Sequence, residues 1–272
     1  MGVSLPSSTR VIITAYNNLP LLRMALRGYL RQTTQDFTLV IADDGSTPEI
    51  KNWLDSFARE TSAQGIELEH VWHEDLGFRR SMILNEAVRQ ASDESLLIFS
   101  DGDCIPPADF VEKHNRAHVP ESFHVGGAYR LDQAISEELT EKDIDSGAFE
   151  SLGSEVHRKD LSRRRFKSRW GTFLRLKNRP KVLGLNMAMD RDLFEDVNGF
   201  DEKFVGYGLE DSDLRDRVMR RSPRPRVVNF YGDNDVYHLW HPVNNTVERR
   251  QLPTWGYYQQ RRPVRCETGL SR

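Results

Sequence analysis

The sequence predicts a doubly wound α/β fold, in which a mostly parallel central sheet is flanked by helices and carries a helical insertion. Two observations predict this fold. Short apolar runs alternate with amphipathic, helix-like stretches through the first 130 residues. Three of the four runs also end in polar residues, and ligands of open α/β sheets bind beyond the carboxyl ends of the strands.

The predicted strands are short runs rich in branched or aromatic residues. They do not alternate cleanly between apolar and polar residues, as expected of strands that are covered on both faces. These runs lie at residues 11–14, 37–42, 66–72 and 96–100. Between them, apolar residues recur at helical spacing over residues 19–30, over residues 50–57 and from Met82 onward.

The second half of the chain is less regular. Residues 131–180 change from acidic to basic and contain few core residues, so we interpret them as a helical insertion at one side of the sheet. A buried strand in "VLGLNMAMD" and a helix beginning in "LEDSDLRDRVMRR" follow. We expect one domain over residues 1–250, made of a first half (about 10–130), the insertion and a second half (about 181–245). The basic residues 251–272 have little apolar patterning and are expected to form a partly disordered tail.

The composition excludes several classes of protein. A net charge of -3 gives no overall attraction to nucleic acid, and we expect no nucleic-acid partner. Two cysteines, Cys104 and Cys266, make no disulfide framework, which fits a reducing compartment. No secretory signal opens the sequence, and no apolar stretch approaches the ~20 residues of a membrane span, so the expected location is the cytoplasm.

The fourth run ends in two carboxylates, in "SLLIFSDGDCIPP". Asp101 and Asp103 are separated only by Gly102, and residues two apart in an extended chain point the same way. Two such close acids repel each other unless a cation or a donor lies between them. A divalent ion such as Mn²⁺ or Mg²⁺, bridging to a phosphate, suits this pair. The alternative is a solvated turn, since Asp-Gly is a common turn pair, but the position after a buried strand favours the metal site.

Two other predicted strands end in similar polar segments. The first leads into "TAYNN" (residues 14–18) and the second into "DDGST" (residues 43–47). The carboxylates of Asp43 and Asp44 can accept a hydrogen bond from a base or a ribose at the ligand-facing edge. The same segment can also serve as a turn and helix N-cap, and the two interpretations are compatible.

A pair of arginines, Arg79 and Arg80, begins the third predicted helix in "HEDLGFRRSMILN", with Asn85 further along it. Near the edge of the sheet these guanidinium groups can offset phosphate charge, although an ordinary surface pair of arginines is the alternative.

The second half offers a candidate general base and candidate metal ligands. In "FVGYGLEDSDL", two glycines surround Tyr207, and Glu210 and Asp211 follow. Acids at a helix start are favourable with the helix dipole, and one of them can also act as general base on an acceptor hydroxyl. In "VYHLWHP", His238 or His241 is a candidate metal ligand, with an ordinary packed histidine as the alternative.

In this order, the motifs resemble those of the family 2 glycosyltransferases of the GT-A fold. The second half is similar to the C-terminal segment of β-1,4-galactosyltransferases and bacterial chondroitin polymerases. The motifs that carry this resemblance are "TAYNN", "DDGS", "DGD", "NGF" (residues 198–200), "GYGLEDSDL" and a late histidine. The resemblance runs from about Val11 to His241 and is weakest over residues 131–180.

The resemblance implies a role for each candidate residue. The nucleotide-sugar site would comprise Thr14, Ala15, Tyr16, Asn17, Asp43, Asp44, Arg79, Arg80, Asn85, Asp101 and Gly102, with Asp44 or Asp43 on the base. Asp103 would bind the metal together with Asp101 and one of the two histidines, of which His238 fits better by its spacing to the downstream asparagines. Asp211 would be the catalytic base, while Glu210, Tyr207 and Gly208 would hold the acceptor or the donor sugar. Leu209 replaces a glycine of the family, which leaves the identity of the sugar open.

The resemblance thus predicts an inverting, Mn²⁺- or Mg²⁺-dependent transfer of a sugar, most readily from a UDP-sugar, to a glycan or lipid-linked hydroxyl in bacterial polysaccharide or lipopolysaccharide synthesis. One alternative is a nucleotidyltransferase acting on sugar phosphates, but "TAYNNLP" lacks the Gly-rich, basic loop of that class. A dehalogenase-like phosphatase would place its Asp pair after the first strand. A non-catalytic glycan- or membrane-binding protein is the third alternative, because residues 158–181 mix cations with aromatics and can contact an anionic membrane at its inner face.

Overall fold

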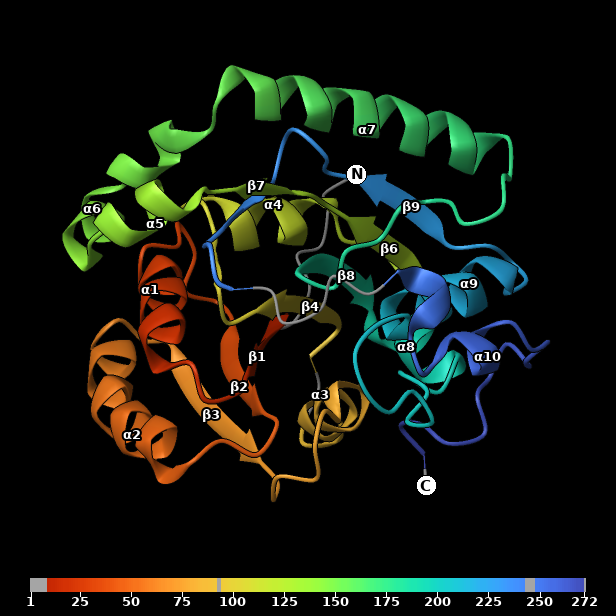
Figure 1. Ribbon diagram of the computed structural model, residues 1–272, viewed down its shortest axis with the longest axis horizontal. Coiled ribbons are helices and arrows are strands. Elements are labelled where there is room, and N and C mark those ends of the chain that lie inside the picture. The colour runs from red at the N-terminus through yellow and green to blue at the C-terminus, as the bar shows by residue number, and fades with distance from the viewer. Residues whose placement is uncertain (1–8, 92–93, 243–247, 272) are drawn as a thin grey trace.

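The computed structural model describes residues 9–91, 94–242 and 248–271, and a seven-stranded sheet with helices on both faces runs through its centre (Figure 1). In sheet order, the strands are β3 (Glu67–Trp72), β2 (Thr38–Asp43), β1 (Thr9–Ala15), β4 (Leu96–Asp101), β8 (Asn186–Asp190), β6 (Ser122–Val125) and β9 (Arg226–Asn229). Strands β1 to β4 are parallel, β8 runs antiparallel to β4 and β6, and β9 is parallel to β6. The predicted mostly parallel sheet is therefore confirmed.

The direction of winding reverses between β1 and β4. From β1 the chain builds outward to β2 and β3, and then returns to place β4 on the other side of β1. Such a reversal opens a crevice at the carboxyl ends of the strands. The register there sets Thr14 opposite Asp101 and Ala15 opposite Asp43. The polar strand ends predicted from the sequence therefore meet at one edge.

The helices cover both faces of the sheet because side chains alternate along each strand. On one face, Val11 and Ile13 pack with α1 (Leu19–Leu30), α2 (Pro48–Ala63) and α4 (Phe110–Ala117). On the other face, Ile12 and Phe99 pack with α3 (Arg80–Arg89), α8 (Arg191–Asp196) and α9 (Glu210–Arg220). Buried strands covered on both faces explain the nearly continuous apolar runs in the sequence.

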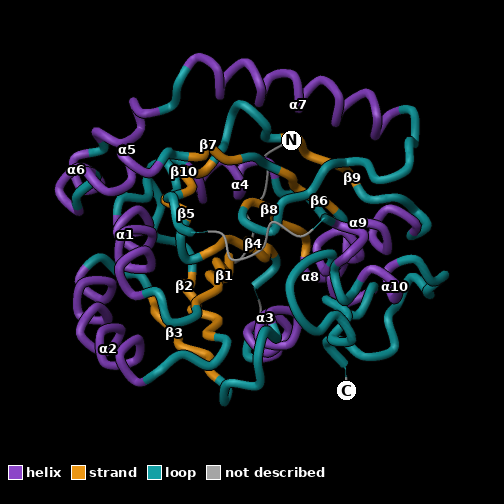
Figure 2. The backbone as a smooth tube through the Cα atoms, in the orientation of Figure 1, coloured by secondary structure: helices purple, strands orange, loops and turns teal. Residues whose placement is uncertain are grey.

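A second, three-stranded sheet lies beside the large one (Figure 2). Its strands are β5 (Cys104–Ile105), β10 (Val236–His238) and β7 (Ala128–Arg130). Strand β5 follows β4 after a two-residue turn, and β10 pairs antiparallel with it so that His238 lies opposite Cys104. This pairing brings the late histidine to the turn that holds Asp103.

The insertion is helical, as predicted. It consists of α5 (Gln133–Glu138), α6 (Glu141–Ser146), the 3₁₀ helix η1 (Ala148–Leu152) and α7 (Glu155–Phe173). Its acidic part faces α1, where Arg23 contacts Glu141 at 2.6 Å and Arg27 contacts Asp145 at 2.6 Å. Helix α7 lies along the outer edge of the molecule (Figure 1). None of the helices in the described ranges is both long and apolar enough to cross a bilayer.

The C-terminal residues are more ordered than their composition suggests. They form the 3₁₀ helix η2 (Arg249–Gln251) and α10 (Trp255–Tyr258), and they are hydrogen-bonded to α9 and the turn before it. Tyr257 donates a hydrogen bond to Asp201 at 2.7 Å, Arg262 pairs with Asp213 at 2.5 Å, and Cys266 is buried. The expectation of a partly disordered tail is therefore wrong for residues 251–271, because aromatic and ionic contacts replace the missing apolar periodicity.

Candidate active site

The turn after β4 is held against the end of β1. The hydroxyl of Thr14 donates to Oδ1 of Asp101 at 3.0 Å. A Cβ atom on Gly102 would lie 2.6 Å from the carbonyl oxygen of Thr14, so no larger residue fits there without moving a strand. Asp101 and Asp103 then meet different partners, because the chain turns between them. The structure thus corrects the expectation that both carboxylates point the same way.

Arg80 joins two acidic segments that are far apart in the sequence. This buried side chain begins α3, and its Nη2 atom lies 2.8 Å from Oδ1 of Asp101 at the end of β4. Its Nη1 atom lies 3.1 Å from Oδ1 of Asp211 and 3.7 Å from Oε1 of Glu210, both at the start of α9. Burial alone would lower the pKa of Arg80, but the three carboxylates more than offset this and raise it. The guanidinium therefore remains charged at the centre of the site.

Asp211 is held at both carboxylate oxygens. While Oδ1 accepts from Arg80, Oδ2 accepts a hydrogen bond from the backbone N–H of Gly184 at 3.0 Å. A Cβ atom at Gly184 would lie 2.4 Å from Oδ2, so only glycine allows this approach. The pKa of Asp211 is raised on balance, because burial and the charge of Asp101 outweigh the lowering by Arg80 and by the N–H of Gly184. Both contacts favour the ionised form.

The neighbouring carboxyl group of Glu210 has fewer hydrogen bonds than that of Asp211. Glu210 is 7% exposed, and its Oε2 atom has no hydrogen-bond partner in the described part of the chain. Burial, followed by the charge of Asp211, raises the pKa of Glu210 to about 7 despite the opposing charge of Arg80. The site therefore holds two neighbouring acids whose pKa values are both raised, and near neutral pH Glu210 is about half protonated.

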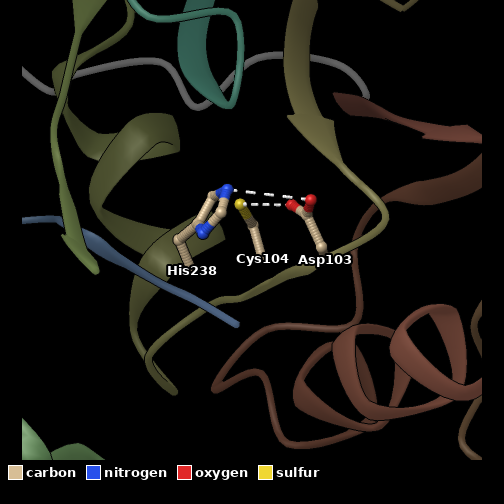
Figure 3. Close-up of side chains that lie close together, drawn as sticks. All are labelled: Asp103, Cys104 and His238. Atoms are coloured by element: carbon tan, nitrogen blue, oxygen red, sulfur yellow. Dashed lines mark hydrogen bonds and ion pairs between the residues drawn. The ribbon is translucent and has the colours of Figure 1, made fainter. Parts of the chain in front are cut away.

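Asp103 lies in a second cluster, with Cys104 and His238 (Figure 3). The thiol of Cys104 donates to Oδ1 of Asp103 at 3.1 Å, and Nε2 of His238 lies 3.7 Å from Oδ2. The donor atoms of these three residues lie within 4.8 Å of one another. His241 approaches from the same side, with Nε2 at 3.1 Å from Oδ2 of Asp103. Both histidines thus face Asp103, and residues 244 and 245, which favoured His238, lie outside the described residues.

The cluster fits a divalent cation. A carboxylate with two imidazoles beside it, at 3.7 Å for His238 and 3.1 Å for His241, offers the kinds of ligand that suit Mn²⁺ or a related ion. Burial raises the pKa of Asp103, but the hydrogen bond from His241 and the charge of His238 outweigh it, so that the net pKa is lowered. Burial and the nearby charge of Asp103 raise the pKa of the Cys104 thiol, which therefore stays neutral and orients the carboxylate as a donor. The sequence interpretation missed this role, although Cys104 directly follows the "DGD" motif.

The acids Asp43 and Asp44, at the end of β2, differ in the hydrogen bonds that their carboxylate oxygens already accept. Asp43 is buried, with Oδ1 accepting from the backbone of Ser46 at 2.8 Å and Oδ2 lying 2.9 Å from His70. Asp44 accepts from the backbone N–H of Arg79 at 2.8 Å through Oδ2, while Oδ1 has no hydrogen bond within the described ranges and lies 3.0 Å from His73. Burial raises the pKa of Asp44, opposed by that N–H and by His73. Asp44 is therefore better placed than Asp43 to accept from a ligand.

The loop after β1 forms an exposed wall of the crevice. Tyr16 has 54% of its surface exposed, and its hydroxyl donates to Asp75 at 3.1 Å. Asn17 braces the loop after β2, because its side-chain oxygen accepts from the backbone of Thr47 at 2.9 Å. In the turn before α9, Tyr207 is exposed and meets the ring of Phe78 edge-on, with centroids 6.0 Å apart.

Asn85 does not lie in the crevice. It is completely buried, its side-chain oxygen accepts from the N–H of Phe200 at 2.9 Å, and its side-chain nitrogen donates to the carbonyl oxygen of Phe200 at 2.8 Å. Asn85 thus fixes the "NGF" turn to α3, and this position corrects the prediction that it contacts the nucleotide.

The turn before α9 is strained and is supported by the C-terminal residues. Leu209 has a φ of 78°, a left-handed conformation that costs a non-glycine residue about 1–2 kcal/mol. The side chain of Leu209 is buried, and the carbonyl oxygen of Gly208 accepts a hydrogen bond from Thr254 at 2.9 Å. The leucine thus keeps a backbone conformation that favours glycine.

Comparison with known proteins gives two family matches. The model described as glycosyl transferase family 2 matches residues 10–196, and the one described as N-terminal domain of galactosyltransferase matches residues 167–242. Validoxylamine A glucosyltransferase from Streptomyces hygroscopicus subsp. jinggangensis (strain 5008) is 29% identical over 227 residues, covering 76% of this chain and 50% of that protein. The chain thus spans about half the length of this relative.

Solved structures give the same architecture. The mannosyltransferase PcManGT from Pyrobaculum calidifontis, in complex with GDP-Man and Mn²⁺, matches with a TM-score of 0.52 and 19% identity, over 94% of this chain and 61% of that one. GalNAc-T7 with UDP, GalNAc and Mn²⁺ matches with a TM-score of 0.55 and 13% identity, over 91% of this chain and 46% of that one. These likenesses confirm the fold that the sequence predicted.

Proposed function

Because the chain belongs to glycosyl transferase family 2, we propose that it transfers a sugar from a nucleotide-sugar to a hydroxyl acceptor, with inversion at the anomeric carbon. The position of Arg80 carries this proposal. Its guanidinium contacts Asp101 at the end of β4 and Asp211 at the start of α9, and so joins the edge of the sheet that suits a nucleotide to an acid that suits a base.

The proposed donor site lies along the ends of β1, β2 and β4. Asp44 accepts a hydrogen bond from the base through Oδ1, the oxygen that lies 3.0 Å from His73, and Tyr16 lies against the nucleoside. Asp101 contacts the ribose, and Arg79 and Arg80 offset the charge of the diphosphate. A UDP-sugar is the proposed donor. One of the structural relatives above was solved with UDP and the other with GDP-Man, so both nucleotides belong in the first test.

The proposed general base is Asp211. It accepts the proton of the acceptor hydroxyl as that oxygen attacks the anomeric carbon from the face opposite the leaving group. Arg80 and the N–H of Gly184 favour the ionised form of Asp211, whereas Glu210, with a pKa of about 7, can donate a hydrogen bond to a sugar hydroxyl. Tyr207 offers an exposed aromatic face on which the acceptor or donor sugar stacks.

The proposed metal ligands are Asp103, His238 and His241. A divalent ion bound there would neutralise the diphosphate leaving group, and Mn²⁺ or Mg²⁺ is the proposed ion. Cys104 supports this site as a neutral donor to Asp103. Asp101 is already held by Thr14 and Arg80, so its proposed role is on the nucleotide side of the ion. The proposed acceptor is a hydroxyl of a glycan or of a lipid-linked saccharide, as the resemblance implies.

Calorimetry tests the donor site and the metal together. UDP would be titrated into the wild-type chain with Mn²⁺, with Mg²⁺ and with EDTA, and into Asp103→Ala. We expect metal-dependent binding that Asp103→Ala abolishes, while the control Asp109→Ala, which removes an exposed acid outside the cluster, binds as the wild type does. If none of UDP, GDP and dTDP binds under any of these conditions, the transferase proposal is wrong.

Product analysis separates the transferase from the nucleotidyltransferase alternative. A transferase incubated with a UDP-sugar and an acceptor releases UDP, whereas a nucleotidyltransferase consumes a nucleoside triphosphate and a sugar phosphate and releases pyrophosphate. Release of pyrophosphate without UDP would decide for the alternative.

A further inference from the structure

The outward face of α7 and the loop that follows it carry an unusual concentration of exposed apolar side chains. Each of five such residues has at least half of its surface exposed, from 50% at Trp170 to 76% at Phe173. Cationic residues lie between and beside them in the sequence. We call this surface the aromatic–basic patch; its residues are Phe166, Trp170, Phe173, Leu174 and Leu176, with Arg163, Lys167, Arg169, Arg175 and Lys177.

The three aromatic rings form one group on the side of α7 that faces away from the protein. The ring centroids of Phe166 and Trp170 are 6.0 Å apart, as are those of Trp170 and Phe173. The helix packs on the protein through the opposite side, where Leu161 and Ser168 are buried. Since α7 lies at the outer edge of the molecule (Figure 1), the rings point to solvent rather than into a neighbouring element.

The cations of the patch differ in their ion pairs from those in the first half of α7. In the first half of α7, Lys159 pairs with Glu155 at 2.7 Å and Arg164 pairs with Asp160 at 2.6 Å. Within the described ranges, none of the five cationic residues of the patch forms an ion pair with a carboxylate. The local charge is therefore strongly positive at the end of α7, although the chain as a whole carries -3.

Three kinds of occupant can be compared by their chemistry. A soluble polyanion would neutralise the cations but leave the exposed rings and leucines in water. A second copy of the chain, docked patch to patch, would bring two sets of cations together. An anionic bilayer satisfies both features, because aromatic and leucine side chains enter the headgroup region while lysine and arginine contact the phosphates. We propose that the aromatic–basic patch docks the protein on a bilayer containing anionic phospholipid.

The patch is connected to the candidate active site through residues 177–183. The segment that leaves α7 through Leu174 and Leu176 continues to Gly184, whose N–H holds Asp211. Docking through the patch would place this segment near the headgroups and present Asp211 to an acceptor carried on a lipid. This last step rests on the proposed function, whereas the docking itself does not.

Vesicle flotation tests the docking. The full chain would be mixed with vesicles of phosphatidylcholine alone and with vesicles of equimolar phosphatidylcholine and phosphatidylglycerol. We expect the protein to float with the anionic vesicles only. Replacing the five cations together by glutamine should weaken this binding by at least about a hundredfold, since each lysine or arginine contributes severalfold to the affinity for an anionic surface.

A charge-matched control separates the patch from general surface charge. This control replaces five exposed arginines elsewhere by glutamine: Arg59, Arg116, Arg224, Arg250 and Arg261. It should bind nearly as the wild type does. A third variant, Phe166→Ser with Trp170→Ser and Phe173→Ser, should lose about tenfold or more although its charge is unchanged.

Four results would overturn the docking proposal. The proposal is overturned if the wild type does not float with anionic vesicles, if the control weakens binding as much as the patch variant does, or if the aromatic variant binds unchanged. It is also overturned if sedimentation shows a wild-type dimer that the aromatic variant dissociates, because the patch would then be a subunit interface. Circular dichroism and calorimetry with UDP on each variant show whether the fold and the donor site remain, so a failure of docking is distinguishable from a failure of the proposed function.

Discussion

The two sides of the candidate site are built in different ways. On the donor side, Thr14 and Asp101 lie at the ends of parallel strands and Asp44 directly follows one, so the hydrogen-bonded register of the sheet sets their positions. On the base side, Glu210 and Asp211 begin a helix after a strained turn, and contacts with distant segments hold them. The donor side is thus fixed by regular structure, and the base side depends on individual side-chain contacts. Mutations should therefore affect the two sides separately.

The largest expected effect comes from removing the proposed base. Asp211→Asn keeps the size of the side chain but cannot accept a proton, so we expect kcat to fall about 10³-fold. Because the donor side is built independently, nucleotide affinity measured by calorimetry should change little. Asp192→Asn, at an exposed acid on α8, is the control and should retain full activity. Equal losses of turnover and nucleotide binding would show that the two sides are not separable.

Arg80 connects the two sides, so its removal tests the comparison directly. We expect Arg80→Gln to lower kcat/KM about 100-fold, because the positive charge beside the developing transition state is lost. Arg80 favours the ionised form of Asp211, so without it the pKa of Asp211 rises and the acid limb of the pH–rate profile moves to higher pH. Arg80→Lys, which keeps the charge, should move that limb back. An acid limb that is unchanged in Arg80→Gln would remove Asp211 as the titrating base.

Glu210 should make the stability of the base side depend on pH. Burial and the charge of Asp211 raise its pKa from 4.5 to about 7. The unfolded chain loses this proton near pH 4.5 but the folded chain keeps it to about pH 7, so wild-type stability falls as the pH rises through this interval. Glu210→Gln removes the titration, and between pH 5 and pH 8 the wild type should lose roughly 2–3 kcal/mol of stability relative to the variant. Denaturant unfolding at pH 5 and 8 measures the difference, and parallel pH dependences would contradict it.

The smallest expected effect concerns the C-terminal support. Thr254→Val keeps the shape but removes the hydrogen bond to Gly208, at a cost of about 1 kcal/mol. Since Gly208 precedes the strained Leu209, we expect kcat to fall severalfold with nucleotide binding unchanged. Thr33→Val, which removes an exposed hydroxyl contact with Glu112, is the matched control. If both variants behave alike, the C-terminal residues do not position the base side.

Most of the donor side could be read from the sequence. Strand residues alternate faces, parallel strands end at a common edge, and so the polar residues after three apolar runs had to meet there. The positions of Thr14, Asp44 and Asp101 follow from this regularity. The position of Asn85 could not be predicted in this way. Helical spacing places a residue on one face of a helix but does not tell whether that face meets a ligand or a buried turn.

The base side shows where prediction from sequence ends. The motif "GYGLEDSDL" marked Glu210 and Asp211, but neither Gly184 nor Thr254 carries a signal in its own neighbourhood. Their contribution is a backbone N–H and a single hydroxyl, groups that occur throughout any chain. They became significant only when folding brought them to Asp211 and Gly208.

By itself, the sequence determined the α/β architecture, the strand ends that form the crevice and the acids and histidines available to it, because periodicity and strand-end chemistry are local properties. The tertiary structure alone decided that Asp101 and Asp103 have different partners, that Arg80 is shared between Asp101 and Asp211, and that the C-terminal residues pack against the base side. The physical reason is that a hydrogen bond or an ion pair requires two groups within about 3–4 Å of each other. For groups distant in the sequence, only the folded chain provides that distance.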